Sequence, residues 1–217
     1  MDRTSACTIL RILISLYQLP DSPRSFLKFE NQFQILVLTI LSAQTTDRIV
    51  NAVRENLFLH YPTPRDLARA QPEDVEEIIK SCGFYKNKAK HIIGAAKALV
   101  EEYDGNVPAN MDALLTLPGV GRKTANIVLN HAFGIDEGIA VDTHVRRVAW
   151  RLGMTDHTHP DHIERDLMAL FPKNAWGKIN YLLIMHGRTV CSARMPSCDS
   201  CPLNSFCRYY LQVFLQK

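Results

Sequence analysis

A lysine directly behind a tight turn is the first residue of this sequence whose position suggests chemistry. In LPGVGRKTAN, residues 117–126, Pro118 stops one helix and Lys123 falls in the first turn of the next. Between them, Gly119 and Gly121 permit backbone angles that are closed to other residues. The free amides at the start of such a helix form an anion site suited to phosphate. An ordinary helical corner with a solvated lysine explains these ten residues equally well.

The turn has the pattern of a helix–hairpin–helix, over about residues 112–133. This motif holds a DNA backbone without reading the base sequence. The stretch GVGRKT also has some likeness to a Walker A phosphate loop. That alternative fails because Lys123 does not follow a glycine and no strand is expected before the turn.

A carboxylate follows nineteen residues after Lys123, in IAVDTHVRRVAW. Asp142 is placed to be the N-cap of a helix whose buried positions include Val145 and Val148. Capping alone explains an aspartate at this position. Arg146 and Arg147 lie one turn further along, where they can meet either phosphate or solvent.

Four cysteines occupy 17 residues near the C-terminal end, in the spacing C-x6-C-x2-C-x5-C: Cys191, Cys198, Cys201 and Cys207. Disulfides are rare in a reducing compartment, so this density predicts a metal site. The spacing does not choose between a zinc ion and an iron–sulfur cluster, because four cysteines suit both. The other two cysteines, Cys7 and Cys82, stand apart and are expected to be buried apolar residues.

The elements that must position these groups all have helical periodicity. Apolar residues recur at helix spacing, proline begins several helices, and no stretch of six residues alternates as a strand would. The longest apolar run, residues 35–41, predicts a buried helix. We therefore expect an all-α fold with about ten helices.

Composition excludes a membrane-spanning protein and indicates an ordinary globular one. Apolar residues make up 47% of the 217 residues and charged residues 22%, and no segment is long enough to cross a bilayer. The N-terminus lacks the features of a signal peptide, so we expect a cytoplasmic protein. The net charge of +3 is too small to indicate a nucleic-acid partner, but only one acid, Asp199, lies between residues 173 and 217. Such segregation fits a basic face, and a solvated helix face explains it as well.

Taken in order, five stretches resemble the endonuclease III family of helix–hairpin–helix DNA glycosylases: LSAQTTD (41–47), GFYKNKA (83–89), LPGVGRKTAN, IAVDTHV and the four-cysteine loop. The likeness extends over roughly residues 25–207. Its specificity comes from the combination of a hairpin lysine, a downstream aspartate and this cysteine spacing.

The resemblance implies two helical lobes with DNA crossing the cleft between them. A six-helix barrel lobe is expected at 25–136, with the helix–hairpin–helix at about 112–133. The second lobe would combine residues 1–24 with 137–217. By the same resemblance, the four cysteines of 191–207 ligate one structural [4Fe–4S] cluster. A monomer, associated with the nucleoid, is the family expectation.

The resemblance also implies the reaction, that of a bifunctional DNA glycosylase and abasic-site lyase of base excision repair. Lys123 would attack C1′ of an oxidised pyrimidine nucleotide, such as thymine glycol, that has been flipped out of duplex DNA. A Schiff base would form, and β-elimination would cut the strand 3′ to the lesion. Asp142 would stabilise positive charge on the sugar and help to manage the lysine proton.

Further positions are expected by resemblance to contact DNA: Gln44, Asp47, Phe84, Gly119, Val120, Gly121, Arg122, Thr124, His144, Arg146, Arg147 and Arg194. Gln44 would fill the space left by the flipped base, and Phe84 takes a wedge position that is commonly leucine. His144 matches a pocket histidine, and a packed core histidine is the alternative. Met195 and Ser197 replace basic residues expected near Arg194, which weakens that loop's attraction for DNA.

Two other functions use the same features. A monofunctional mismatch or adenine glycosylase has this scaffold and a four-cysteine cluster, but such enzymes usually lack a lysine at the position of Lys123. Because only ten residues follow Cys207 in this sequence, we also do not expect the extra recognition domain of the adenine enzymes. A non-catalytic DNA-binding or electron-transfer module would leave Lys123 and Asp142 as a coincidence.

Overall fold

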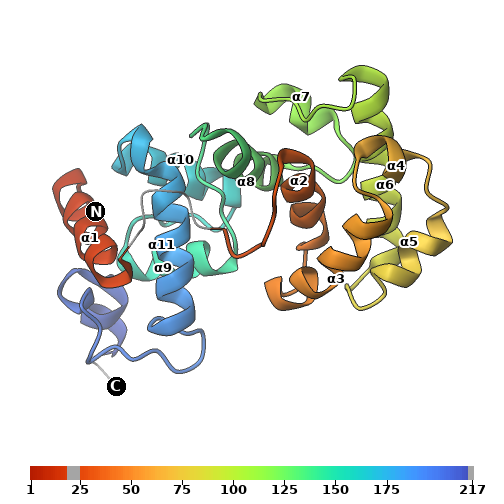
Figure 1. The fold of residues 1–217 in the computed structure, drawn as a ribbon. Coiled ribbons are helices and arrows are strands. Elements are labelled where there is room, and N and C mark those ends of the chain that lie inside the picture. Colours follow the sequence, from red (N-terminus) through yellow and green to blue (C-terminus); the bar gives the residue numbers. More distant parts are fainter. Residues whose placement is uncertain (19–24, 215–217) are drawn as a thin grey trace. The chain divides into compact units, whose positions relative to one another are not determined.

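The computed structural model describes residues 1–18 and 25–214, and within those ranges it contains helices and no strands (Figure 1). Eleven α-helices are present there, close to the ten expected, together with three short 3-10 or π segments. The chain divides into two compact units: Met1–Arg24 with Asp136–Lys217 form unit 1, and Ser25–Ile135 form unit 2. Residues 19–24 and 215–217, which the sequence analysis assigns to the second lobe, lie outside the described residues.

Unit 2 is an uninterrupted segment folded around one apolar helix, α2. Its helices are α2 (Gln32–Leu41), α3 (Asp47–His60), α4 (Pro64–Ala68), α5 (Pro72–Ile78), α6 (Tyr85–Glu102), α7 (Met111–Thr116) and α8 (Arg122–Phe133). Helix α2 packs against α3, α6 and α8, while α4 and α5 pack against α6.

Helix α2 is central because its sequence is apolar on every side. All residues from Phe33 to Leu41 are buried, which confirms the buried helix predicted for this run. Its one buried hydroxyl, on Thr39, donates to the Ile35 carbonyl at 2.6 Å, so no polar group is left unsatisfied at that point.

Unit 1 is built from both ends of the chain. It contains α1 (Arg3–Tyr17), α9 (Thr143–Leu152), α10 (Pro160–Leu170), α11 (Trp176–Thr189) and three short segments, Lys173–Ala175, Asn204–Phe206 and Tyr210–Phe214. Helix α11 packs against α9 and α1, and α10 packs against α1 and α9 (Figure 1). The cysteine segment follows α11 directly.

Helix starts occur where proline and capping residues indicate them. Pro64, Pro72 and Pro160 each stand at the beginning of a helix, which confirms the prediction that proline begins several helices. Thr63 and Asp66 form a reciprocal capping box at the start of α4.

The two isolated cysteines differ from each other. Cys82 is buried as expected, whereas Cys7 is exposed, so the prediction for Cys7 was wrong. The buried face of α1 is made by Ala6, Ile9, Leu10 and Leu13, and this places Cys7 on the outer side of the helix.

Among the described residues, no helix combines the length and the apolar character needed to cross a membrane.

Candidate functional site

The glycine turn joins α7 to α8, and only one of its two glycines needs unusual backbone angles. Gly119 has φ +78°, and a Cβ added to it would lie 2.8 Å from Cβ of His91 on α6. Gly121 has φ −103° and nothing within 4 Å of an added Cβ, so the prediction of a special conformation there was wrong. The turn is tight because the main chain at Gly119 passes directly over α6.

Lys123 is the second residue of α8, on its exposed side. The opposite side of the helix is buried through Ala125, Val128 and Leu129. Gly121 is the N-cap and has no side chain with which to bond the first amides of the helix. This helix start can therefore offer both backbone N–H groups and an amine to an anionic ligand.

Asp142 is the N-cap of α9, as predicted. Its Oδ1 accepts a hydrogen bond from the Val145 N–H at 2.8 Å, and its side chain is half-buried. The bond holds the carboxylate in one orientation at the positive end of the helix dipole. Lys123 belongs to unit 2 and Asp142 to unit 1.

Arg147 is bonded to protein groups on α11 and beyond. Its guanidinium donates to the carbonyl oxygens of Gly187 (2.8 Å) and Cys191 (3.1 Å) and lies 3.1 Å from Nδ1 of His144. Burial is the main cause of the lowered pKa of His144, and Arg147 lowers it further. A neutral His144 can accept the guanidinium N–H through Nδ1. DNA contact by either residue remains a prediction.

Two turns of unit 2 each hold a non-glycine residue in the left-handed region. Gln44 has φ 53° in the turn after α2, and Phe84 has φ 59° just before α6. Gln44 is exposed, and Phe84 has 71% of its surface exposed, which is unusual for a large apolar side chain. Sequence reasoning selected both residues by resemblance, but nothing in the sequence signals their backbone conformation.

The other predicted contact residues lie in varied surroundings. Arg122, Arg146 and Arg194 are exposed, while Asp47 and Thr124 are half-buried. Val120 is buried, with 8% of its surface exposed. Any contact that it makes with DNA at this turn would therefore come from its main chain.

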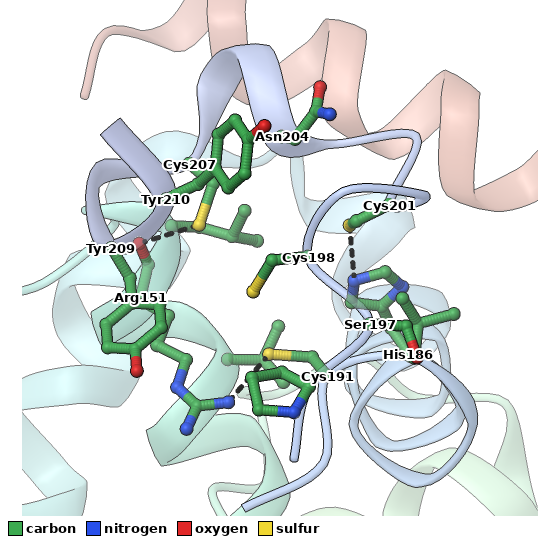
Figure 2. Close-up of a pocket in the computed structure, with 14 residues that line it drawn as sticks. Arg151, His186, Cys191, Ser197, Cys198, Cys201, Asn204, Cys207, Tyr209 and Tyr210 are labelled. Carbon is green, nitrogen blue, oxygen red and sulfur yellow. Dashed lines mark hydrogen bonds between the residues drawn. The ribbon is translucent and has the colours of Figure 1, made fainter. Parts of the chain in front are cut away.

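The four clustered cysteines line one pocket in unit 1, together with Arg151 and His186 (Figure 2). The sulfur atoms of Cys191, Cys198 and Cys207 face its open centre, while Cys201 Sγ lies 3.5 Å from Nε2 of His186. All four are free thiols. In the described part of the chain, no three cysteine, histidine or acidic side chains converge closely enough to hold a single metal ion.

Deprotonating the cysteines of this pocket costs free energy unless the thiolates bind a cation. Burial is the main cause of the raised pKa of Cys198, Cys201 and Cys207, and the neighbouring cysteines raise each of them further. Thiolate is the form that ligates metals. Arg151 lowers the pKa of Cys198 and Cys207 but does not offset their burial. A cation that the thiolates themselves ligate would remove this penalty, so the donor set suits a metal centre.

Arg151 is one of the residues of this pocket, with His186, that sequence reasoning missed. It is buried on α9, with 8% of its surface exposed, and donates to Sγ of Cys191 at 3.3 Å. Its guanidinium also lies 4.7 Å from the ring centre of Tyr209. In the sequence Arg151 is one more charge on a basic helix, so the sequence carries no signal of this burial.

The sequence of this chain is similar to those of known proteins. The model of the HhH-GPD superfamily of base excision DNA repair proteins matches residues 37–173. Endonuclease III of Synechocystis sp. is 52% identical over 202 residues, which cover 93% of this chain and 91% of that protein. Endonuclease III of Escherichia coli is 40% identical over 204 residues, 94% of this chain and 96% of that protein.

Solved structures are also similar to this chain. A trapped endonuclease III–DNA covalent intermediate has a TM-score of 0.91 and 40% identity, covering 97% of this chain and 98% of that one. A non-covalent endonuclease III–DNA complex has a TM-score of 0.92 and 39% identity, with complete coverage of both chains. A thermostable thymine-DNA glycosylase has a TM-score of 0.85 at 24% identity, which shows a shared fold.

Proposed function

Because this chain belongs to the endonuclease III family of the HhH-GPD superfamily, we propose that it acts on oxidised pyrimidines of the thymine glycol type in duplex DNA. It is a bifunctional DNA glycosylase and abasic-site lyase of base excision repair. The observation that carries the proposal is Lys123, an exposed amine at the start of α8 directly behind the glycine turn.

Lys123 supplies the nucleophile. Its neutral Nζ forms a bond to C1′ of the damaged nucleotide, and the C1′–N1 bond breaks with its electron pair going to the departing base, which takes up a proton. The sugar ring opens to a Schiff base between Nζ and C1′. Loss of a proton from C2′ and departure of the 3′ phosphate complete the β-elimination, and hydrolysis of the Schiff base frees the lysine.

Asp142 acts on the charge that this reaction develops. Its carboxylate stabilises the positive charge growing on the sugar and accepts or returns the lysine proton. The bond from Val145 N–H supports this role, because it fixes one carboxylate oxygen and leaves the other oriented by the same cap.

Damaged duplex DNA is held chiefly through its backbone. The amides at the start of α8 and the side chains of Arg122 and Thr124 meet phosphate next to the lysine. Gln44 and Phe84 enter the base stack where the damaged nucleotide leaves it. Unit 2 serves as the barrel lobe and unit 1 as the cluster lobe of a monomeric enzyme that works on the nucleoid in the cytoplasm.

Cys191, Cys198, Cys201 and Cys207 hold one [4Fe–4S] cluster. The cluster supplies positive iron centres to four thiolates and thereby fixes the segment after α11. Three facts support this assignment: the thiols are free, they surround one pocket, and burial together with their mutual repulsion calls for a cation there. Purified protein should be brown with broad visible absorbance; a colourless protein with stoichiometric zinc would refute the iron assignment.

Borohydride trapping tests the enzymatic proposal. The protein is incubated with duplex DNA bearing thymine glycol or an abasic site, and borohydride then reduces any Schiff base to a stable adduct. We expect an adduct from the wild-type protein that disappears in Lys123→Gln. Lys80→Gln removes another exposed lysine of unit 2 and should trap normally.

Absence of an adduct with the wild-type protein would contradict the lyase. If the base is nevertheless released and the strand breaks only after alkali, the protein is a monofunctional glycosylase. No release of any kind would favour a non-catalytic DNA-binding protein.

A further inference from the structure

We propose that Lys88 is a positioning residue that fixes the Gln44 turn and the Phe84 turn to each other, so that both side chains enter DNA as one unit. This inference rests on the proposed function, which places Gln44 and Phe84 in the base stack. Neither the proposed reaction nor the proposed contacts with the DNA backbone involve Lys88.

Lys88 is buried, and no carboxylate of residues 1–18 or 25–214 pairs with it. Only 4% of its surface is exposed, and its Nζ donates a 2.6 Å hydrogen bond to the hydroxyl oxygen of Thr45, a residue 43 positions earlier. Lysine is almost never buried to this degree unless it is paired. Burial lowers the pKa of Lys88, an effect that the nearby Cys82 thiol partly opposes. A group so costly to bury needs a reason to be there.

The bonding of Lys88 reaches both turns. Its side chain bonds Thr45, the residue directly after Gln44, and its main-chain N–H donates to the carbonyl oxygen of Phe84 at 3.1 Å. The two turns also lie close to each other. A Cβ added to Gly83 would be 3.7 Å from the Gln44 carbonyl oxygen and 3.9 Å from the Thr45 hydroxyl oxygen.

Both turns need such support because each is strained. Gln44 and Phe84 have φ of 53° and 59°, a region that side-chain-bearing residues rarely adopt. Strained residues keep their conformation only when the surrounding structure determines it several times over. The Lys88–Thr45 hydrogen bond is a constraint of this kind, and it acts on the turn of Gln44 from α6, the helix that follows Phe84.

The function of the link is preorganisation. A side chain that fills the space of the lost base and one that separates neighbouring bases must reach the duplex together, at a fixed spacing. Ordering the turns only upon binding would add an entropic cost to extrusion of the nucleotide. A polar link below the two turns avoids that cost and leaves both exposed side chains free to meet DNA.

The experiment compares an extrusion-dependent substrate with an extrusion-independent one. The variants are Lys88→Met, which keeps most of the apolar stem but lacks the amine, and Thr45→Val, which replaces the hydroxyl with a methyl group of similar size. One substrate is duplex DNA with thymine glycol beside 2-aminopurine, whose fluorescence reports unstacking. The other is a single-stranded oligonucleotide with an abasic site, trapped by borohydride, in which no base must leave a duplex.

We expect both variants to lose about tenfold in excision from the duplex and to lose the fluorescence rise, as for one lost hydrogen bond. The double variant should be no worse than either single one, because one bond is removed in each case. Trapping on the single strand should stay at the wild-type level. Thr45→Ser, which retains the hydroxyl, should excise at the wild-type level. Thr39→Val should also leave excision unchanged.

The outcomes separate the two proposals. No trapping by the wild-type protein on either substrate contradicts the proposed function. Normal trapping by the wild-type protein, with wild-type excision by folded Thr45→Val, overturns the role of Lys88. Equal losses on both substrates overturn it as well, since they indicate general damage to the fold. If Lys88→Met does not fold, Thr45→Val and Thr45→Ser decide the matter alone.

Discussion

The guanidinium of Arg151 bonds the sulfur of Cys191 at 3.3 Å and, through the same planar group, the carbonyl oxygens of Ser192 (2.7 Å) and Ala193 (3.0 Å). Helix α9 is thereby tied to the first part of the cysteine segment. The Arg151 carbonyl accepts a further hydrogen bond from Sγ of Cys207 at 3.3 Å. One residue thus contacts both ends of the four-cysteine loop.

Replacing Arg151 should loosen this loop. In Arg151→Gln we expect a loss of about 3 kcal/mol in the free energy of unfolding, since several buried carbonyls lose a charged donor. The visible absorbance should also fade faster when the protein is held with a chelator. Thermal unfolding and absorbance decay measure the two effects. Arg165→Gln, on the exposed side of α10, is the control, and equal decay in the two variants would contradict the prediction.

Gly119 should tolerate substitution less well than a glycine elsewhere that also has a positive φ. Gly119→Ala brings a Cβ to 2.8 Å from His91, whereas Gly134→Ala meets nothing within 4 Å, and both positions have positive φ. We expect a cost of about 1 kcal/mol for Gly134→Ala from backbone strain alone, and at least about 2 kcal/mol for Gly119→Ala. Denaturant unfolding decides, and equal costs would show that the contact with α6 has no effect.

The two roles of Asp142 can be separated by two substitutions. Asparagine caps a helix as well as aspartate, so Asp142→Asn should unfold within about 0.5 kcal/mol of the wild-type protein. Asp142→Ala should lose about 1 kcal/mol because the bond to Val145 N–H is gone. Excision of thymine glycol should fall about 100-fold in both, because both lack the charge. Normal excision by Asp142→Asn would show that Asp142 serves only as a helix cap.

His131 should make unit 2 sensitive to acid. Burial lowers the pKa of His131 from 6.5 to about 4, and its Nδ1 is a buried atom without a hydrogen-bond partner. Between pH 6.5 and 4 the unfolded chain binds a proton at this residue that the folded chain does not, so stability falls as the pH falls. The slope is at most about 1.4 kcal/mol per pH unit for this one group.

Thermal unfolding at pH 6.5, 5.5 and 4.5 measures the effect. His131→Leu cannot bind the proton, so its unfolding temperature should fall less steeply than that of the wild-type protein. His60→Gln changes an exposed histidine at the end of α3 and should keep the wild-type slope. His186 also has a pKa of about 4, so some slope should remain in every variant.

The parts of this molecule that sequence could predict are those fixed by neighbours in the chain. The buried run of α2, the cap at Asp142 and the conformation of Gly119 all depend on a few adjacent residues. The cysteine cluster is equally local, because its four ligand candidates lie within 17 residues.

The parts that escaped prediction depend on distant packing. Arg147 and Arg151 look like surface charges on a basic helix, yet their guanidinium groups bond carbonyls some 40 residues away. The burial of Lys88 requires a turn 43 residues earlier to lie over it. Periodicity places a residue on one side of a helix, but it does not say which segment will cover that side.

The division of unit 1 between the two ends of the chain gives its folding an order in time. A ribosome releases unit 2 as an unbroken segment, which can close its core as soon as Ile135 has emerged. Helix α1 is made before any of this, and its partners α10 and α11 are made only after unit 2. The apolar side chains of Ile9 and Leu13 therefore stay unburied through most of translation, and during that interval the nascent protein is most exposed to aggregation.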